Sequence, residues 1–315
     1  MPHDRRFRFA VICSGTNTPD AKSFTELARR AEGAGYSTLY VPDHFEEHPL
    51  APTVALAHAA AVTNTLRVGP LVLGNDYKHP VVLAREMATL DMLSNGRLEL
   101  GIGAGWMTVD YEKAGMPLDR PGVRIERLAE SITILKGLFA PGPFTFEGSH
   151  YQVRDLDGAP KPVQQPMPFV IGGGGPKILA LAAKEADIVG INANLRSGDG
   201  NTPDAAQSLT PAATDAKLAT LRKAAGARFD DLEIQTLVGF VHVTDDAGPI
   251  FEGMAGHFGV TPDEARLAPV TLVGTLDEMV DLLEERRERW QMSYVVIDDA
   301  FAEAFEPVVA RLAGK

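Results

Sequence analysis

The sequence predicts an α/β protein of the (β/α)8 TIM-barrel class, and three observations support that prediction. Eight apolar runs with strand character alternate with segments that carry apolar residues at helical spacing. Most of these runs are continuously apolar, which is typical of parallel strands buried on both faces. The chain has 315 residues, and a barrel of this kind takes roughly 250. A single domain over residues 1–315, with insertions, therefore accounts for the whole length.

The elements follow in a regular order. Expected strands cover residues 7–13, 38–41, 67–73, 98–103, 168–172, 187–191, 232–243 and 294–297. Expected helices cover residues 23–34, 52–64, 81–93, 122–139, 177–184, 212–225 and 276–290. The first helix ends at Gly35 and the third at Ser94-Asn95-Gly96, residues typical of helix ends.

Insertions after strands 3 and 4, and a hairpin before strand 5, fill the remaining length. They include residues 106–121, residues 141–165 with a hairpin around Gly148, and a later segment at 194–215. The last is rich in Gly, Ser, Asn, Asp and Pro, so we expect a mobile loop that closes over the site. The alternative fold is a doubly wound open sheet, but its Gly-rich turn is missing after the first strand.

Composition excludes several classes of protein. The formal charge of -12 is the wrong sign for binding nucleic acid or an anionic membrane surface. The single cysteine, Cys13, permits no internal disulfide and no cysteine-based zinc site. No apolar stretch reaches the roughly 18 residues of a membrane span, and no secretory leader is visible. We expect a cytoplasmic protein.

Candidate functional residues follow the strands, because barrel sites lie at the carboxyl-terminal ends of strands. The second strand leads into Asp43-His44 and, four residues later, His48. An imidazole can exchange a proton near neutrality, and Asp43 could orient it. The two histidines lack the context of a metal pair, so no metal site is expected. The alternative to a role in proton transfer is a hydrogen-bonded structural histidine. Lys78, after the third strand, is expected to be a solvated residue at the rim of the barrel.

Two glycine-rich stretches follow later strands. Gly103, Ala104 and Trp106 end the fourth strand, where small residues let a flat ligand approach the backbone; relief of packing would explain them equally. The fifth strand ends in four glycines before Pro176, which starts a helix. Backbone amides and the positive end of that helix predict an anion site there. The candidate cradle residues are Gly172, Gly173, Gly174 and Gly175, with Asn192 and Ala193 after the sixth strand completing it.

These motifs together resemble the luciferase-like superfamily of flavin and deazaflavin oxidoreductases. The most specific stretch runs from His79-Pro80 through Asp91 and Ser94-Asn95-Gly96-Arg97 to the glycines before Trp106. The chain looks most similar to the branch that uses coenzyme F420, a deazaflavin that carries a phosphate. The resemblance implies the same barrel, and commonly a homodimer.

The resemblance also implies roles for particular residues. In that branch an Asp-His pair faces the cofactor ring, which matches Asp43 and His44. A non-prolyl cis bulge backs the ring, which matches Leu71 and Val72. The glycine turn after the fifth strand binds the cofactor phosphate.

Two departures from the branch concern the substrate. Members that oxidise sugar phosphates or alcohols have an acid where this chain has Trp106, and a tryptophan where it has His48. A less polar substrate is therefore expected, in a pocket bordered by Trp106, His48 and Cys13. An inert buried thiol is the ordinary role of such a cysteine.

The function expected is hydride transfer between F420 and a small organic substrate, with His44 exchanging a proton. One alternative is the FMN-dependent oxygenase of a two-component monooxygenase with the same fold. A second is a non-catalytic flavin-binding protein, since barrels can lose activity and keep their fold.

Overall fold

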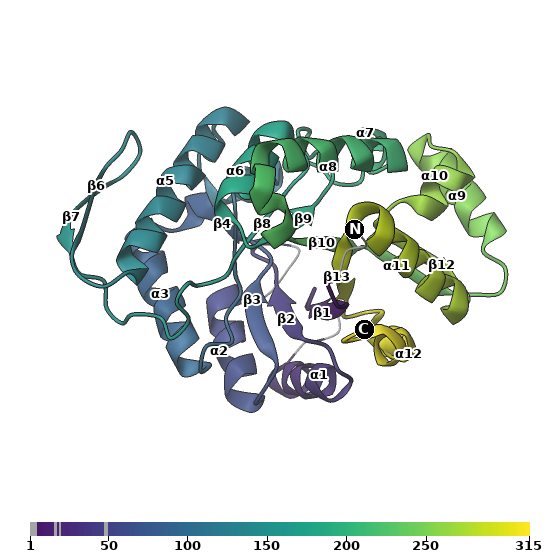
Figure 1. The fold of residues 1–315 in the computed structure, drawn as a ribbon, viewed down its shortest axis with the longest axis horizontal. Coiled ribbons are helices and arrows are strands. Elements are labelled where there is room, and N and C mark those ends of the chain that lie inside the picture. The colour runs from purple at the N-terminus through teal and green to yellow at the C-terminus, as the bar shows by residue number, and fades with distance from the viewer. Residues whose placement is uncertain (1–4, 16–17, 19, 47–49) are drawn as a thin grey trace.

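The fold is a closed barrel of parallel strands with helices around it (Figure 1). The computed structural model describes residues 5–15, 18, 20–46 and 50–315. One sheet runs in the order β3-β2-β1-β13-β10-β9-β8-β5-β4, with every neighbouring pair parallel. β3 and β4 are consecutive pieces of one chain segment, so the sheet closes on itself. The predicted fold class is confirmed.

The barrel strands are short and almost wholly buried, because helices cover their outer face and side chains fill the interior. Their bounds are β1 (Arg8–Ile12), β2 (Thr38–Val41), β3 (Arg67–Pro70), β4 (Leu73–Gly74), β5 (Leu100–Gly103), β8 (Phe169–Gly173), β9 (Ile188–Ile191), β10 (Glu233–Val238) and β13 (Met292–Asp298).

The helices fall between the strands as the sequence predicts, with several more near the carboxyl terminus. They are α1 (Ala21–Gly33), α2 (Pro52–Val62), α3 (Pro80–Leu93), α4 (Thr108–Ala114), α5 (Pro121–Phe139), α6 (Pro176–Glu185), α7 (Pro203–Gln207), α8 (Pro211–Ala225), α9 (Gly248–Phe258), α10 (Pro262–Leu267), α11 (Leu276–Trp290) and α12 (Ala302–Leu312), with 3-10 turns η1 (Asn75–Tyr77) and η2 (Gly226–Asp231). The hairpin expected before strand 5 is β6 (Phe144–Glu147) with β7 (Gln152–Leu156).

Two strand predictions need correction. The expected strand 232–243 breaks at Gly239, and its second half is β11 (Phe240–Val243), which leaves the barrel to pair with β12 (Thr271–Gly274). Three of the four β11 residues are exposed, so this half was never a strand buried on both faces. The expected strand 67–73 is interrupted by the cis peptide between Leu71 and Val72.

A polar cluster closes the amino-terminal end of the barrel interior. Glu99 is fully buried and accepts hydrogen bonds from Arg8, Arg67, Tyr40 and Tyr294. Burial acts to raise the pKa of Glu99, but the two arginines more than offset it, so the pKa lies below its ordinary value. A functional site is therefore expected at the opposite end of the barrel, where the strands end.

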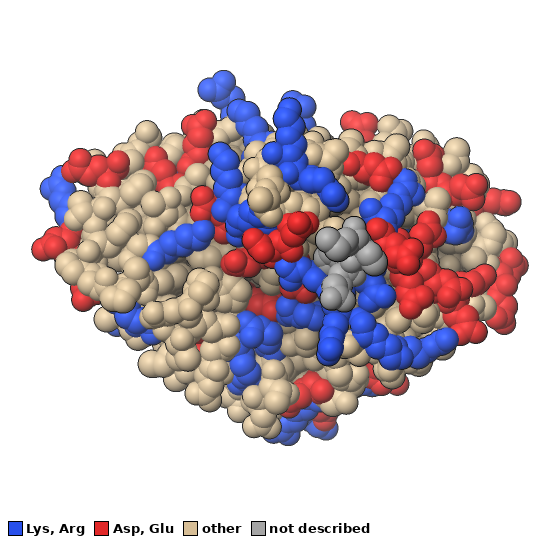
Figure 2. Space-filling model, viewed as in Figure 1, with Lys and Arg blue, Asp and Glu red and all other residues tan. Residues whose placement is uncertain are grey.

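Charge is unevenly distributed over the surface. Figure 2 shows acidic side chains gathered at the right of the molecule, over α11 and its neighbours, and a mostly uncharged surface at the left, over α2 and α3. Within the described part of the chain, no helix is both long and apolar enough to cross a bilayer.

Candidate active site

The predicted site residues come from the ends of neighbouring barrel strands, so they share one end of the barrel, called here the mouth. Asp43 and His44 follow β2, the Leu71-Val72 bulge separates β3 from β4, and Trp106 follows β5. The four glycines end β8 and precede α6, while Asn192 and Ala193 follow β9. His48 lies outside the described residues.

His44 is held by a carboxylate that the sequence analysis did not single out. Its Nδ1 lies 2.6 Å from Oδ2 of Asp110, a residue of α4 whose side chain is fully buried. A carboxylate only accepts hydrogen bonds, so Nδ1 carries the hydrogen and donates it. Asp110 also accepts from the Phe45 amide at 3.1 Å and from the Tyr77 hydroxyl at 3.4 Å. Three partners therefore fix this carboxylate behind the imidazole.

Asp43 forms a hydrogen bond to the backbone of a neighbouring strand, so its predicted role in orienting the imidazole stays a prediction. Its Oδ2 accepts from the Gly74 amide at 3.0 Å, across the gap between β2 and β4. Burial raises the pKa of Asp43 above its usual value. Asp43 is adjacent to His44 in sequence, but its side chain is bonded to β4. Asp110 is 66 residues away in sequence and contacts the imidazole from α4.

Trp106 lies beside His44, as a wall of the same site. The two ring centroids are 5.6 Å apart and the planes meet at 82°, an edge-to-face contact. The turn before Trp106 is held from behind by Arg124 of α5, which donates to the carbonyls of Ala104 and Gly105. Gly105 has a φ of +74°, and a Cβ there would collide with the Tyr111 hydroxyl.

The predicted non-prolyl cis peptide is present between Leu71 and Val72. Val72 packs against β5, where a Cβ on Gly103 would lie 2.7 Å from Val72 Cγ2. Glycine at 103 is therefore explained by this close contact within the barrel. A cofactor-binding role for Gly103 and Ala104 stays a prediction.

The glycine cradle after β8 contains two kinds of glycine. Three of them meet neighbours closely: a Cβ would lie 2.6 Å from Asn192 Nδ2 at Gly172, 2.3 Å from Ile178 Cγ2 at Gly173 and 2.1 Å from the Ala193 carbonyl oxygen at Gly174. Gly175 is different, since nothing lies within 4 Å of its Cβ position. It is the N-cap of α6 and provides no side-chain cap.

That open position is where an anion fits. The first amides of a helix have no partner within the helix, and α6 begins with Pro176, which has no amide hydrogen. The amides of Lys177 and Ile178 and the positive end of the helix then face the space beside Gly175. The residues present fit a phosphate group.

The loop after β9 reaches across this cradle. A Cβ on Gly198 would lie 2.0 Å from Thr108 Oγ1, and one on Gly200 would lie 3.9 Å from the Trp106 ring. The base of the loop is fastened by the Asn194 amide, which donates to Ser208 Oγ at 2.8 Å. The segment contains α7 and the first turn of α8, and its mobility stays a prediction.

Cys13 does not border an open pocket. It is 1% exposed, and its Sγ lies 3.2 Å from Thr18 Oγ1. Burial raises the pKa of the thiol to about 11, which removes the reactive thiolate at neutral pH. The expectation that Cys13 borders the substrate pocket is therefore corrected in favour of an inert packing role.

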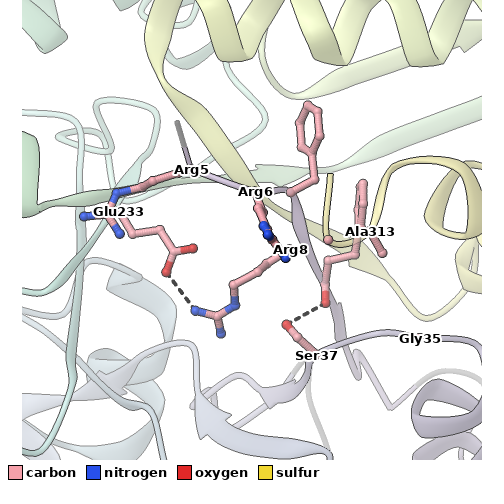
Figure 3. Close-up of a pocket in the computed structure, with 10 residues that line it drawn as sticks. Arg5, Arg6, Arg8, Gly35, Ser37, Glu233 and Ala313 are labelled. Carbon is pink, nitrogen blue, oxygen red and sulfur yellow. Dashed lines mark hydrogen bonds and ion pairs between the residues drawn. The ribbon is translucent and has the colours of Figure 1, made fainter. Parts of the chain in front are cut away.

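A cavity of about 490 Å³ lies at the other end of the barrel, away from all these residues. Its walls include Arg5, Arg6, Arg8 and Glu233, and Figure 3 shows Arg8 paired with Glu233 across it. These residues begin strands, and barrel function is located at the opposite end. Among the residues that the structure describes, no three His, Cys, Asp or Glu side chains gather where they could hold a metal ion.

The structure is thus a parallel barrel whose mouth combines a glycine-rich turn before a helix with a histidine held by a buried carboxylate. A family model described as luciferase-like monooxygenase matches residues 7–247. The chain belongs to that family.

Individual relatives are more distant. An F420-dependent glucose-6-phosphate dehydrogenase from Amycolatopsis mediterranei is 33% identical over 174 residues, which are 53% of this chain and 52% of that protein. The matched part thus spans about half the length of such curated relatives.

Solved structures share the whole fold at low identity. The F420-dependent tetrahydromethanopterin reductase from Methanopyrus kandleri has a TM-score of 0.76 at 18% identity, covering 98% of this chain and 99% of that one. The FMN complex of the oxygenating constituent of 3,6-diketocamphane monooxygenase from Pseudomonas putida has a TM-score of 0.70 at 16% identity, with 98% of each chain covered.

Proposed function

We propose that this protein is an F420-dependent oxidoreductase that passes a hydride between the deazaflavin and a small organic substrate. The observation that carries the proposal is the pairing of His44 with Asp110 at the same barrel mouth as an open anion cradle. The choice of cofactor is supported by one relative and one structural neighbour that are F420-dependent enzymes.

The cradle would hold the phosphate of the cofactor. Gly175 leaves space beside the amides of Lys177 and Ile178, and a helix start of this kind favours a negative group. When bound, the deazaflavin supplies the hydride chemistry; the protein supplies position, exclusion of water and a proton.

His44 would exchange that proton. Asp110 holds Nδ1 as a donor and stabilises the ring when it is positively charged, so Nε2 is the atom that takes a proton from the substrate or returns it. The carboxylate behind His44 thus comes from Asp110, four residues after Trp106.

The substrate would be small and less polar than a sugar phosphate. Trp106 presents an aromatic surface 5.6 Å from His44 in place of a carboxylate. The loop containing Gly198 and Gly200 lies against Thr108 and Trp106, and would exclude water during hydride transfer.

We also propose that two copies pair through the outer faces of α2 and α3. α2 has no charged residue, and the largest exposed apolar side chains on these helices are Val54, Val82, Met92 and Leu93. An uncharged surface of this kind is unusual on a chain of net charge -12 and is typical of protein interfaces.

Oxygenation with reduced FMN is the second candidate function, favoured by the FMN-bound neighbour. Stopped-flow mixing separates the two. The purified protein should transfer hydride between F420 and a panel of ketones, alcohols and activated alkenes, and His44→Asn should slow this transfer. Peroxide formation or substrate oxygenation with reduced FMN, without F420 turnover, would support the oxygenase. Tight binding without any turnover would support a non-catalytic protein.

A further inference from the structure

Lys217 of α8 is a buried lysine with no acidic partner among the described residues. It is 7% exposed, and its Nζ donates to the backbone carbonyls of Asn192, at 2.7 Å, and Ser208. No described carboxylate forms an ion pair with it, and burial alone lowers its pKa, to about 8. Burying an ammonium without a counter-ion is costly, so its retention at this place calls for a compensating negative group.

The glycine cradle is next to this ammonium. The Asn192 carbonyl oxygen that accepts from Lys217 lies 2.6 Å from the position of a Cβ on Gly174. Only one carbonyl therefore separates the lysine from the cradle backbone. Carbonyl oxygens bring partial negative charge to the edge of an anion site, and a cation bound to one of them offsets it.

The same lysine also fastens the loop that crosses the cradle. Its second acceptor, Ser208, ends α7, and the Ser208 hydroxyl accepts from the Asn194 amide. Asn192 and Ser208 bracket the loop at its two ends. The Lys217 ammonium thus binds one carbonyl beside the glycine cradle, that of Asn192, and one at the far end of the loop, that of Ser208.

We propose that Lys217 is a positioning residue for the anionic group of the cofactor, and that its charge strengthens binding of the phosphate without touching it. This inference rests on the proposed function, because it takes the cradle to be the phosphate site. The ligand proposed for the glycine cradle is the phosphate of a cofactor that has a flat ring.

The test compares two ligands that differ in the phosphate. The deazariboflavin core of F420 and the 5′-phosphate of this core are titrated by fluorescence into wild type, Lys217→Met and Lys217→Gln, after thermal melting has verified that each variant is folded. F420 itself is not used for this comparison, because it also carries a polyglutamate tail. Glutamine keeps a donor for the carbonyls without the charge. Lys223→Met, an exposed position on the same helix, is the matched control.

The preference of wild type for the phosphorylated core over the core should fall about tenfold in Lys217→Met and in Lys217→Gln, as expected for one charge acting through a few ångströms of partly polar protein. Affinity for the core should stay within about twofold, and Lys223→Met should keep the wild-type preference.

Equal losses for both ligands would make Lys217 a structural clamp only, and an unchanged preference would remove it from anion binding; either overturns the inference. A wild type that binds the phosphorylated core and the core equally well would instead overturn the phosphate site itself.

Discussion

Replacing Asp110 by asparagine removes a charge from behind His44 while keeping the size of the side chain. In the wild type, Asp110 Oδ1 accepts from the Phe45 amide and Oδ2 accepts from His44 Nδ1. An asparagine whose Oδ1 still accepts from Phe45 presents its NH2 group to Nδ1. Two donors cannot pair, so the imidazole must move its hydrogen to Nε2.

The size of the effect follows from the geometry. The Nδ1···Oδ2 distance of 2.6 Å and full burial of the carboxylate indicate a charge-assisted bond, of the kind that contributes about 1.5–3 kcal/mol. A correctly placed acid–base group contributes roughly 10²–10⁴ in rate. We therefore expect kcat to fall about a hundredfold in Asp110→Asn, which corresponds to about 2.7 kcal/mol in the activation free energy.

Two assays check this result. Proton–nitrogen NMR of histidine-labelled protein, with His44 assigned through His44→Gln, reports which ring nitrogen carries the hydrogen. Hydride transfer with F420 reports kcat, and titration reports cofactor affinity, which should remain within about threefold because Asp110 lies behind the histidine.

Asp76→Asn provides the matched control. Asp76 is also buried near the mouth, but it accepts from Tyr111 at 3.2 Å and pairs with Arg127 at 2.7 Å. Its replacement should leave the His44 tautomer and kcat nearly unchanged. An Asp110→Asn protein with the wild-type tautomer and a kcat within threefold of wild type would refute the role given to Asp110.

Three further predictions concern catalysis, pH and assembly. His44→Ala should lower turnover about a hundredfold or more while F420 titration gives a nearly unchanged Kd; unchanged turnover would remove His44 from the mechanism. Burial lowers the pKa of Lys217 in the folded chain to about 8 from 10.5. The free energy of unfolding of wild type, relative to that of Lys217→Met, should therefore be lowest below pH 8, where folding buries a charge. It should rise by roughly 3 kcal/mol between pH 8 and pH 10.5. Urea unfolding of both proteins across this range checks the sign, and a constant difference would contradict it. Light scattering should give the mass of a dimer for wild type and of a monomer for Val54→Glu. A monomeric wild type would contradict the proposed pairing.

The barrel was predictable because its pattern is local. Strands such as β2 and β9 are buried on both faces, so their sequence is continuously apolar. The same reasoning failed for residues 232–243, where an apolar run hides a change of partner at Gly239. α9 was missed because three of its residues, Gly248, Gly253 and Gly256, weaken the helical signal.

The site was predictable only where it follows a strand. His44 and the glycines after β8 could be found because barrel chemistry lies at strand ends. Asp110 and Lys217 lie inside helices, and their partners are brought to them by tertiary packing, 66 and 25 residues away. A signal for Asp110 did exist, because it is an acid four residues after Trp106, in the insertion that follows β5.

A fluorescence titration of the protein with F420 and, in parallel, with FMN tests the central claim most directly. It should be repeated on Gly175→Asp and Gly175→Asn, because no atom of the described residues other than its chain neighbours lies within 4 Å of that Cβ position, whereas a side chain at Gly173 would collide with Ile178. The two new side chains have the same size and both can cap α6, and only aspartate adds a negative charge.

The account predicts micromolar F420 binding with FMN much weaker, and an F420 affinity about tenfold or more lower in Gly175→Asp than in Gly175→Asn. Preference for FMN, or full F420 affinity in Gly175→Asp, would contradict it.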